Sequence, residues 1–295
     1  DLDYSITTNK DFLPGLTGNE LLAEDSGIDE LIVRIKIPKD EELKYHLFNS
    51  DVKAVVSETA NEKVYEWTFI NIPALIREYN HPNYGEFAPR LVFTTNGSSR
   101  EAYSTLAKQL KDFSIPEAFK SDSGSQAQIA LDLQAKIVND LELLRIAPEV
   151  IGFKMRTLDE VWQSMSATEL EKAVFLSTAL QKQGIEARTL LIAKQQQIDT
   201  TFSNLLNYSK AAVCVHTDDQ QHFLLAVDDL NDADSRYHFG EYHALVFING
   251  SFREVHLPFP SDVKNTSELK VALQVNNADS ISGDFSFKVS GATYP

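Results

Sequence analysis

The stretch that decides the fold is Ser166-Ala-Thr-Glu-Leu-Glu-Lys-Ala-Val-Phe-Leu-Ser-Thr-Ala-Leu-Gln-Lys-Gln-Gly-Ile-Glu-Ala-Arg-Thr-Leu-Leu-Ile-Ala193. Apolar residues recur in it at three- and four-residue spacing, at Ala173, Leu176 and Leu180. This periodicity predicts a helix with one apolar face, because residues at that spacing lie above one another. We therefore place a buried helix at the centre of the molecule.

Both ends of this helix carry local signals. Ser166 and Thr168 are each followed three residues later by a glutamate, which is the spacing of an N-terminal capping box. Gly184 can adopt a positive φ without a Cβ clash, which predicts a left-handed C-terminal cap. The continuous apolar run at 190–193 then predicts a short strand that is covered on both faces.

The pattern Thr168-x-x-Glu-Lys-Ala-x-x-Leu-x-x-Ala-Leu-x-x-x-Gly-Ile-x-Ala187 resembles the core helix and strand of bacterial transglutaminase-like proteins. These proteins share the papain-like cysteine protease fold. In active relatives the helix begins with the nucleophilic Cys, four residues before the Ala found here at 173. That position is Glu169 in this chain, and a glutamate cannot replace a thiolate as the acyl-transfer nucleophile.

The resemblance also implies where the other two triad residues would stand. In the family, the His opens the first strand of a hairpin and the Asp ends the second strand. Aligned to the apolar runs at 211–215 and 222–227, these positions fall on Lys210 and Ala226. With Glu169, Lys210 and Ala226 at the triad positions, we expect an inactive site that uses no cofactor.

The one cysteine, Cys214, leaves an alternative open. His216 lies two residues further along the same expected strand, so both side chains would point to one face, and Asp228 could orient the His. An active cysteine hydrolase built this way requires an exposed Cys214 of low pKa. Cysteine is commonly buried, and the acidic run at 228–234 is typical of a solvated turn, so we favour a structural thiol.

Composition excludes several other classes of site. A single cysteine cannot form an intrachain disulfide or a multi-cysteine zinc site. The acidic run at 228–234 lacks the glycine and the bidentate Glu of an EF-hand, and His238 and His243 lie on no expected helix, so we expect no metal site.

Charge and hydropathy limit the classes of partner that we expect. Lys plus Arg number 27 against 43 Asp plus Glu, which gives a net charge of −16. A chain this acidic repels phosphate backbones and anionic membrane surfaces, so we expect no nucleic-acid partner. No apolar run reaches the roughly 20 residues of a membrane-spanning helix.

Residues 1–118 are interpreted as a β-rich domain. Short strands are expected at 31–37, 52–56, 64–70 and 91–94, separated by turns, which is typical of a β-sandwich. The run from Tyr65 and Trp67 through Pro73 and Pro89 to Phe93 resembles the end of a β-domain of unknown function that often precedes transglutaminase-like domains. Only the C-terminal half of that larger domain is recognised, and the chain starts without Met, so we interpret it as a fragment.

The rest of the chain is divided in two. A helix at 126–142, the central helix and strand, and the hairpin form a core at 119–235. Alternating strands at 245–248, 252–257, 269–275 and 285–289 predict a small C-terminal β-domain at 236–295. The expected fold class is α+β, with a transglutaminase-like (papain-like cysteine protease) core flanked by β-sandwich-type domains.

We therefore expect a non-catalytic scaffold or binding module of a secreted multidomain bacterial protein. Its location in the periplasm or at the cell surface is implied by the resemblance alone. Its partner would be a peptide, protein or glycan of unknown identity. A glycan- or peptide-binding module that uses exposed Trp67 or Trp162 is a further alternative.

Overall fold

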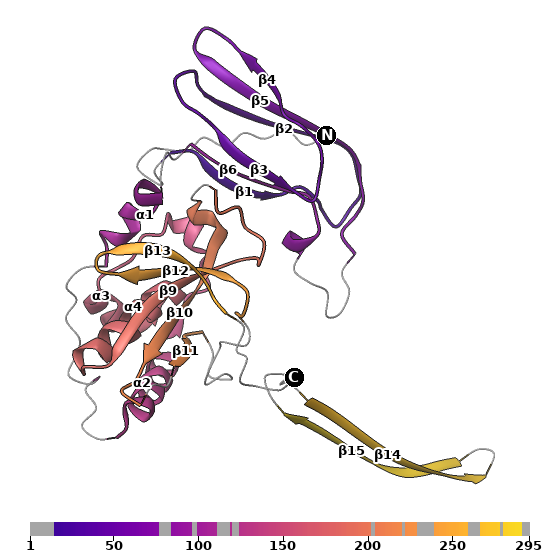
Figure 1. Cartoon of the computed structure of the whole chain (residues 1–295), viewed down its shortest axis with the longest axis vertical. Coiled ribbons are helices and arrows are strands. Elements are labelled where there is room, and N and C mark those ends of the chain that lie inside the picture. The colour runs from indigo at the N-terminus through magenta and orange to yellow at the C-terminus, as the bar shows by residue number, and fades with distance from the viewer. Residues whose placement is uncertain are drawn as a thin grey trace.

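The computed structural model describes residues 15–76, 84–95, 99–110, 119, 124–201, 204–219, 222–228, 239–258, 266–277 and 280–290. Figure 1 shows three parts: an N-terminal pair of sheets, a central sheet with helices, and a hairpin that extends away from both. The fold mixes α and β structure, as the sequence predicted.

The N-terminal part is a sandwich of two antiparallel three-stranded sheets. One has the order β1-β6-β3 and the other β2-β5-β4. Their strands are β1 (Thr17–Leu21), β2 (Ile28–Pro38), β3 (Lys44–Phe48), β4 (Val55–Glu58), β5 (Glu62–Ile72) and β6 (Arg90–Thr94). Side chains from both sheets, among them Ile37, Trp67 and Phe93, form one buried cluster. Trp67 is 0% exposed, so the alternative of a binding module that uses an exposed Trp67 is wrong.

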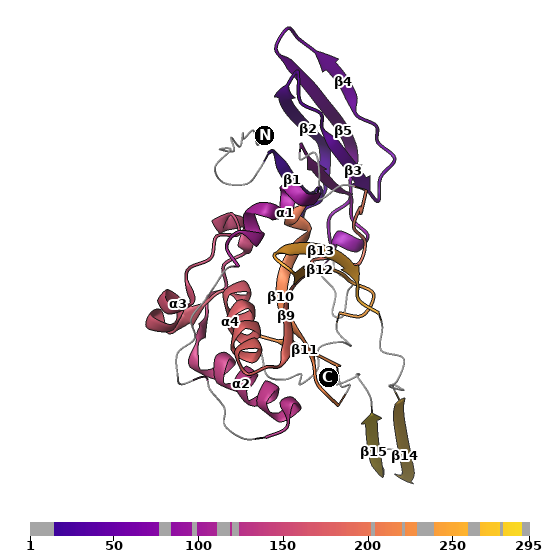
Figure 2. The ribbon, with the colours of Figure 1, turned by 60° about the vertical axis from the view of Figure 1, so that its left-hand side comes forward.

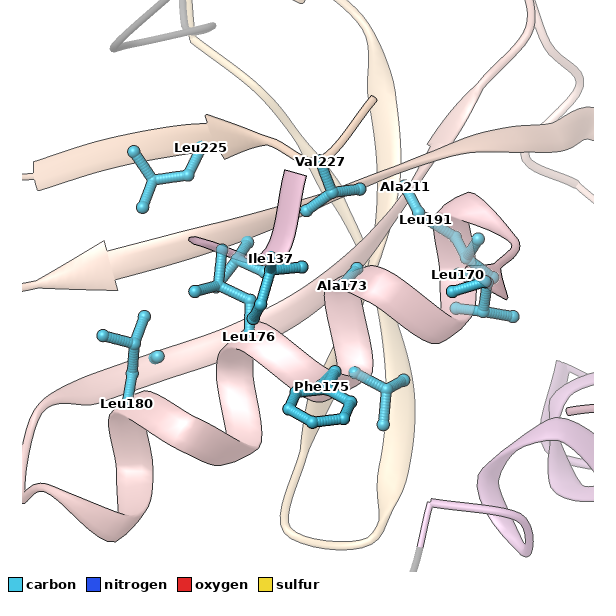
Figure 3. Packing of buried hydrophobic residues seen from close by; sticks show 14 of the residues in the cluster. Ile137, Leu170, Ala173, Phe175, Leu176, Leu180, Leu191, Ala211, Leu225 and Val227 are labelled. Atoms are coloured by element: carbon cyan, nitrogen blue, oxygen red, sulfur yellow. The ribbon is translucent and has the colours of Figure 1, made fainter. Parts of the chain in front are cut away.

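The central part is built on a five-stranded sheet of order β11-β10-β9-β12-β13. Helix α4 (Glu169–Lys182) packs on it, and α2 (Gln126–Asp140) packs on α4 (Figure 2). The strands are β9 (Glu186–Ala193), β10 (Tyr208–His216), β11 (His222–Ala226), β12 (His243–Ile248) and β13 (Ser251–His256). Figure 3 shows the predicted apolar face of α4, with Ala173, Leu176 and Leu180, buried among Ile137, Leu225 and other apolar side chains.

Smaller elements complete the core. They are α1 (Ser99–Ala107), which packs against β13, α3 (Leu158–Ser164), the short parallel strands β7 (Glu142–Leu143) and β8 (Ser166–Ala167), and the 3-10 turns η1 (Tyr84–Glu86), η3 (Pro148–Ile151) and η4 (Leu205–Asn207).

Only one of the two capping boxes expected for α4 forms. Thr168 caps the helix, and its Oγ1 accepts a hydrogen bond from the Glu171 N–H at 3.3 Å. Ser166 instead lies in β8. At the other end Gly184 has φ of +79°, as predicted.

The structure corrects the expected start of the C-terminal domain at residue 236. β12 pairs with β9, in the register Ala244 with Ile192 and Val246 with Leu190. The hairpin β12–β13 is therefore part of the core sheet. Local alternation identified the strands, but their partner comes from a tertiary contact that short-range patterning cannot reveal.

The last described residues form a hairpin of β14 (Thr266–Asn277) and β15 (Ser280–Ser290). Within the described part of the chain, this is a separate two-stranded sheet. Seven of its large apolar side chains are more than half exposed: Leu269, Val271, Leu273, Val275, Ile281, Phe285 and Phe287.

Buried polar side chains join the sandwich to the core. Asn204 is 0% exposed, and its Nδ2 donates to the carbonyl oxygens of Gly18 at 2.7 Å and Phe93 at 3.1 Å. Arg90, also buried, donates from Nη2 to the Gln197 carbonyl at 2.7 Å. These bonds fix the segment after β9 against β1 and β6.

Candidate functional site

A pocket of about 220 Å³ opens beside the first turn of α4. Backbone and side chains from three segments meet there: the connection after β7, the N-terminus of α4 and the start of β10. The lining residues are Leu144, Arg145, Ile146, Ala147, Pro148, Ile151, Phe153, Lys154, Thr168, Glu169, Leu170, Ser209 and Lys210. The pocket therefore lies where the family resemblance placed the nucleophile and the His.

Three ionised side chains meet at this point. Lys210 Nζ lies 3.0 Å from Glu169 Oε1 and 3.1 Å from Asp228 Oδ2. The second oxygen of Glu169 accepts a hydrogen bond from the Ala211 N–H at 3.2 Å. Partial burial acts to lower the pKa of Lys210, but the hydrogen bonds and charges of Glu169 and Asp228 outweigh it and raise that pKa. Lys210 is consequently held in its protonated form.

The third member of this cluster is Asp228, whereas the family resemblance aligned the Asp of the triad with Ala226. Ala226 is paired with Ala212 across the strands, and its carbonyl accepts a hydrogen bond from Gln134 Nε2 at 2.8 Å. Continuing that register by two residues places Asp228 opposite Lys210. The alignment used the apolar run, whereas the carboxylate that contacts Lys210 lies just beyond the end of β11.

The alternative trio of Cys214, His216 and Asp228 is not assembled. Cys214 is half-buried and packs against the cluster of Leu190, Ala212 and Leu224, on the face of the sheet that faces away from α4. His216 Nδ1 lies 3.0 Å from Nδ1 of His222 on the neighbouring strand. Asp228 binds Lys210 and so belongs to the pocket cluster.

A buried ion pair supports the first turn of α4. The Glu171 carboxylate, 3% exposed, accepts hydrogen bonds from Arg156 Nη2 at 2.7 Å, from the Arg156 N–H at 2.9 Å and from the Thr168 N–H at 2.9 Å. Burial acts to raise the pKa of Glu171, but these donors outweigh it and lower that pKa. The pair fixes the start of the helix, and with it the position of Glu169.

Lys172 lies behind the cluster and is 1% exposed. Its Nζ donates to the Val138 carbonyl at 3.3 Å. Burial lowers its pKa, and the charges of Asp228 and Glu169 act in the opposite direction. Sequence reasoning missed Arg145 and Lys154 as pocket residues, because no motif connects segments this far apart. Lys172 entered it only as part of the helix pattern.

Other residues singled out from the sequence lie away from the pocket. Trp162 is partly buried and packs edge-on against Phe119 with ring centroids 4.9 Å apart. His243 pairs with His256 across β12 and β13 at 5.1 Å between ring centroids, while His238 and the acidic run at 229–234 lie outside the described residues. The described residues contain no group of three or more His, Cys, Asp or Glu side chains placed to hold a metal ion. None of the described helices combines the length and apolarity needed to cross a bilayer.

No protein-family model and no curated protein matches the sequence. Among solved structures, a crystal structure described as a putative protease from Parabacteroides distasonis ATCC 8503 superimposes with a TM-score of 0.72 at 25% identity. The chain shares the fold of this protein. The match covers 91% of this chain but 55% of the Parabacteroides protein, so this chain spans about half of its length.

A second solved structure is described as a putative cysteine protease from Cytophaga hutchinsonii. It matches at 11% identity over 94% of this chain and 84% of that one, with a TM-score of 0.29. The shared fold is therefore assigned from the Parabacteroides structure alone.

Proposed function

We propose that this chain is a non-catalytic binding module with a transglutaminase-like core, in which an ion cluster replaces the catalytic triad. The observation that carries the proposal is the cluster of Glu169, Lys210 and Asp228 at the first turn of α4. Acyl transfer requires a thiolate and a base that can accept its proton. Glu169 provides no thiolate, and a lysine of raised pKa is already protonated.

The pocket remains in place although these groups lack the chemistry of a nucleophile and a base. Residues from the β7–η3 connection and from α4 still enclose about 220 Å³ beside the cluster. A concave, partly apolar surface with a few charged groups is the usual form of a ligand site. This supports binding of a peptide, protein or glycan without turnover.

The fold shared with a bacterial putative protease supports an origin among proteins of that type. We extend the proposal to a role as scaffold or binding part of a secreted multidomain protein, in the periplasm or at the cell surface. This extension rests on the resemblance of the sequence to secreted transglutaminase-like proteins.

The test is the alkylation rate of Cys214 with iodoacetamide between pH 5 and pH 10, with the urea-unfolded protein as reference. We expect labelling slower than in the unfolded chain and an apparent thiol pKa at or above about 8.5, because Cys214 lies inside strand β10 rather than at a helix N-terminus and packs against an apolar cluster. A peptide-hydrolysis assay with wild type and Cys214→Ala accompanies it. Rapid labelling below pH 7, or hydrolysis that is lost in Cys214→Ala, would show an active cysteine enzyme instead.

A further inference from the structure

The pocket carries a surplus of positive charge in an otherwise acidic chain. Arg145, Lys154 and Lys210 line it against the single carboxylate of Glu169, while the whole chain has a net charge of −16. Glu169 is already satisfied by Lys210 and by the Ala211 N–H. Neither Arg145 nor Lys154 forms an ion pair with another described residue. Two cations at the pocket are thus available to a ligand.

Apart from Thr168 and Ser209, the rest of the lining is apolar. Ile146, Ile151, Phe153 and Leu170 contribute to it, and Ile146 is 43% exposed at the pocket. The volume of about 220 Å³ lies below the roughly 300 to 1,000 Å³ of pockets that take drug-sized ligands. It suits a group of about the size of one amino-acid residue.

We infer that this pocket binds a carboxylate attached to a small apolar group, as at the C-terminal residue of a peptide. The Arg145 guanidinium can form paired hydrogen bonds with a carboxylate, and Lys154 adds a second positive charge. The partial positive charge at the start of α4 acts in the same direction. Glu169 and Asp228 lie close by and disfavour a doubly charged anion such as phosphate.

This inference rests on the proposed binding function and names the ligand class of the same site. The two can fail separately. Binding that is indifferent to the carboxylate would leave a non-catalytic binding module standing. Cleavage of the peptide would overturn the proposed function whatever the pocket recognises.

The experiment is isothermal titration of the full chain with acetyl-Ala-Ala-Leu ending in a free carboxylate and with the same peptide ending in an amide. We expect the amide to bind at least tenfold more weakly. Arg145→Gln and Lys154→Gln should each raise the Kd for the acid by about five- to tenfold, which is the loss of one charge-assisted contact. Lys182→Gln, at the exposed far end of α4, is the matched control and should change the Kd less than twofold.

Titrations with N-acetyl-leucine and with inorganic phosphate complete the experiment, and the first of them identifies the source of the carboxylate. N-acetyl-leucine that binds as tightly as the tripeptide would assign the pocket to small acids, and weaker binding would assign it to peptide ends; both agree with a carboxylate site. Equal binding of acid and amide, no binding of either up to about 5 mM, or tighter binding of inorganic phosphate would each overturn the inference. Circular dichroism of the variants, all at exposed positions, excludes misfolding as the cause of a lost affinity.

Discussion

Individual charged residues at the first turn of α4 determine what this site can do. Glu169, Lys210 and Asp228 join the helix to the ends of two strands through ion pairs of 3.0 and 3.1 Å. These groups are partly solvated, so their pairing contributes modestly to stability, on the order of 1 kcal/mol or less per pair. Their main consequence is chemical, because at the positions that the family resemblance assigns to a nucleophile and a base they supply neither a thiol nor an unprotonated base.

A thiol placed at residue 169 tests whether the site still provides the electrostatics of a nucleophile position. In a Cys214→Ala background, we expect the cysteine of Glu169→Cys to have a pKa below about 7.5, because the helix N-terminus and Lys210 both stabilise a thiolate. The measurement is iodoacetamide labelling against pH. Lys182→Cys, at the opposite end of the same helix, is the control and should titrate at or above about 8.5. Equal pKa values at both ends would contradict this view of the site.

Glu171 provides a stability prediction with a defined pH dependence. Glu171→Gln removes the charge that pairs with Arg156. We expect the free energy of unfolding at pH 7 to fall by about 2–3 kcal/mol. This loss is smaller than for a fully buried ion pair, because Arg156 is partly solvated. The folded-state pKa of Glu171 lies below the ordinary value of 4.5, so this contribution is complete above about pH 4.5 and is lost as the pH falls through the folded pKa.

Urea unfolding of both proteins at several pH values measures this difference. We expect the gap between wild type and Glu171→Gln to narrow at acidic pH. Glu160→Gln removes the equivalent capping carboxylate of α3, where the side chain is exposed, and should cost less. A gap that stays constant down to pH 3 would rule out the ionised pair as its source.

At the scale of secondary-structure elements, α4 and the segment between β9 and β10 organise the molecule. α4 is buried along nearly its whole length between α2 and the sheet. The segment that contains η4 contacts the sandwich through Asn204, whose side chain also caps η4 by accepting from the Leu206 N–H at 2.8 Å. One buried amide thus joins three backbone segments.

Asn204→Ala should therefore destabilise the protein by about 2–3 kcal/mol. The substitution removes two buried hydrogen bonds, to the carbonyl oxygens of Gly18 and Phe93, and the cap on the Leu206 N–H. Each hydrogen bond contributes about 0.5–1.5 kcal/mol. Gln128→Ala is the control, because the Gln128 amide bonds only Asp132 on the exposed side of α2. A loss no greater than that of the control, in chemical denaturation, would show that the interface does not depend on Asn204.

At the scale of the whole molecule, the β14–β15 hairpin stands apart from the two cores. Seven large apolar side chains on it are more than half exposed, and an isolated two-stranded hairpin is marginally stable in water. Removing residues 259–295 should leave the thermal midpoint of the remainder within about 2 °C, since the hairpin adds nothing to either buried cluster.

The same deletion should reduce the fluorescence of the dye ANS bound to the folded protein, because the exposed apolar surface is lost. The comparison is differential scanning calorimetry and ANS titration of the full and shortened chains. A fall in midpoint of several degrees would mean that the hairpin packs against the core in solution.

The sequence by itself determined the elements whose signals are local. The apolar face of α4, its Thr168 cap, the positive φ of Gly184 and the alternation along β2, β5 and β14 follow from residue spacing and from the conformations that each residue allows. The fold shared with a bacterial protein described as a putative protease is consistent with the papain-like fold that the α4 pattern implied. The family resemblance also assigned Glu169, from the helix pattern, and Lys210, from a weaker match to the strand, to one site, and the two side chains lie 3.0 Å apart.

Only the tertiary structure decided which distant segments meet. It brought Asp228 rather than Ala226 to Lys210, added β12 and β13 to the central sheet, and placed Arg145 and Lys154 at the pocket. It also placed Cys214 against a separate apolar cluster, four residues along β10 from Lys210. Strand partners and pocket walls depend on contacts between residues far apart in the chain, and their free energy comes from burial and pairing that no local pattern encodes.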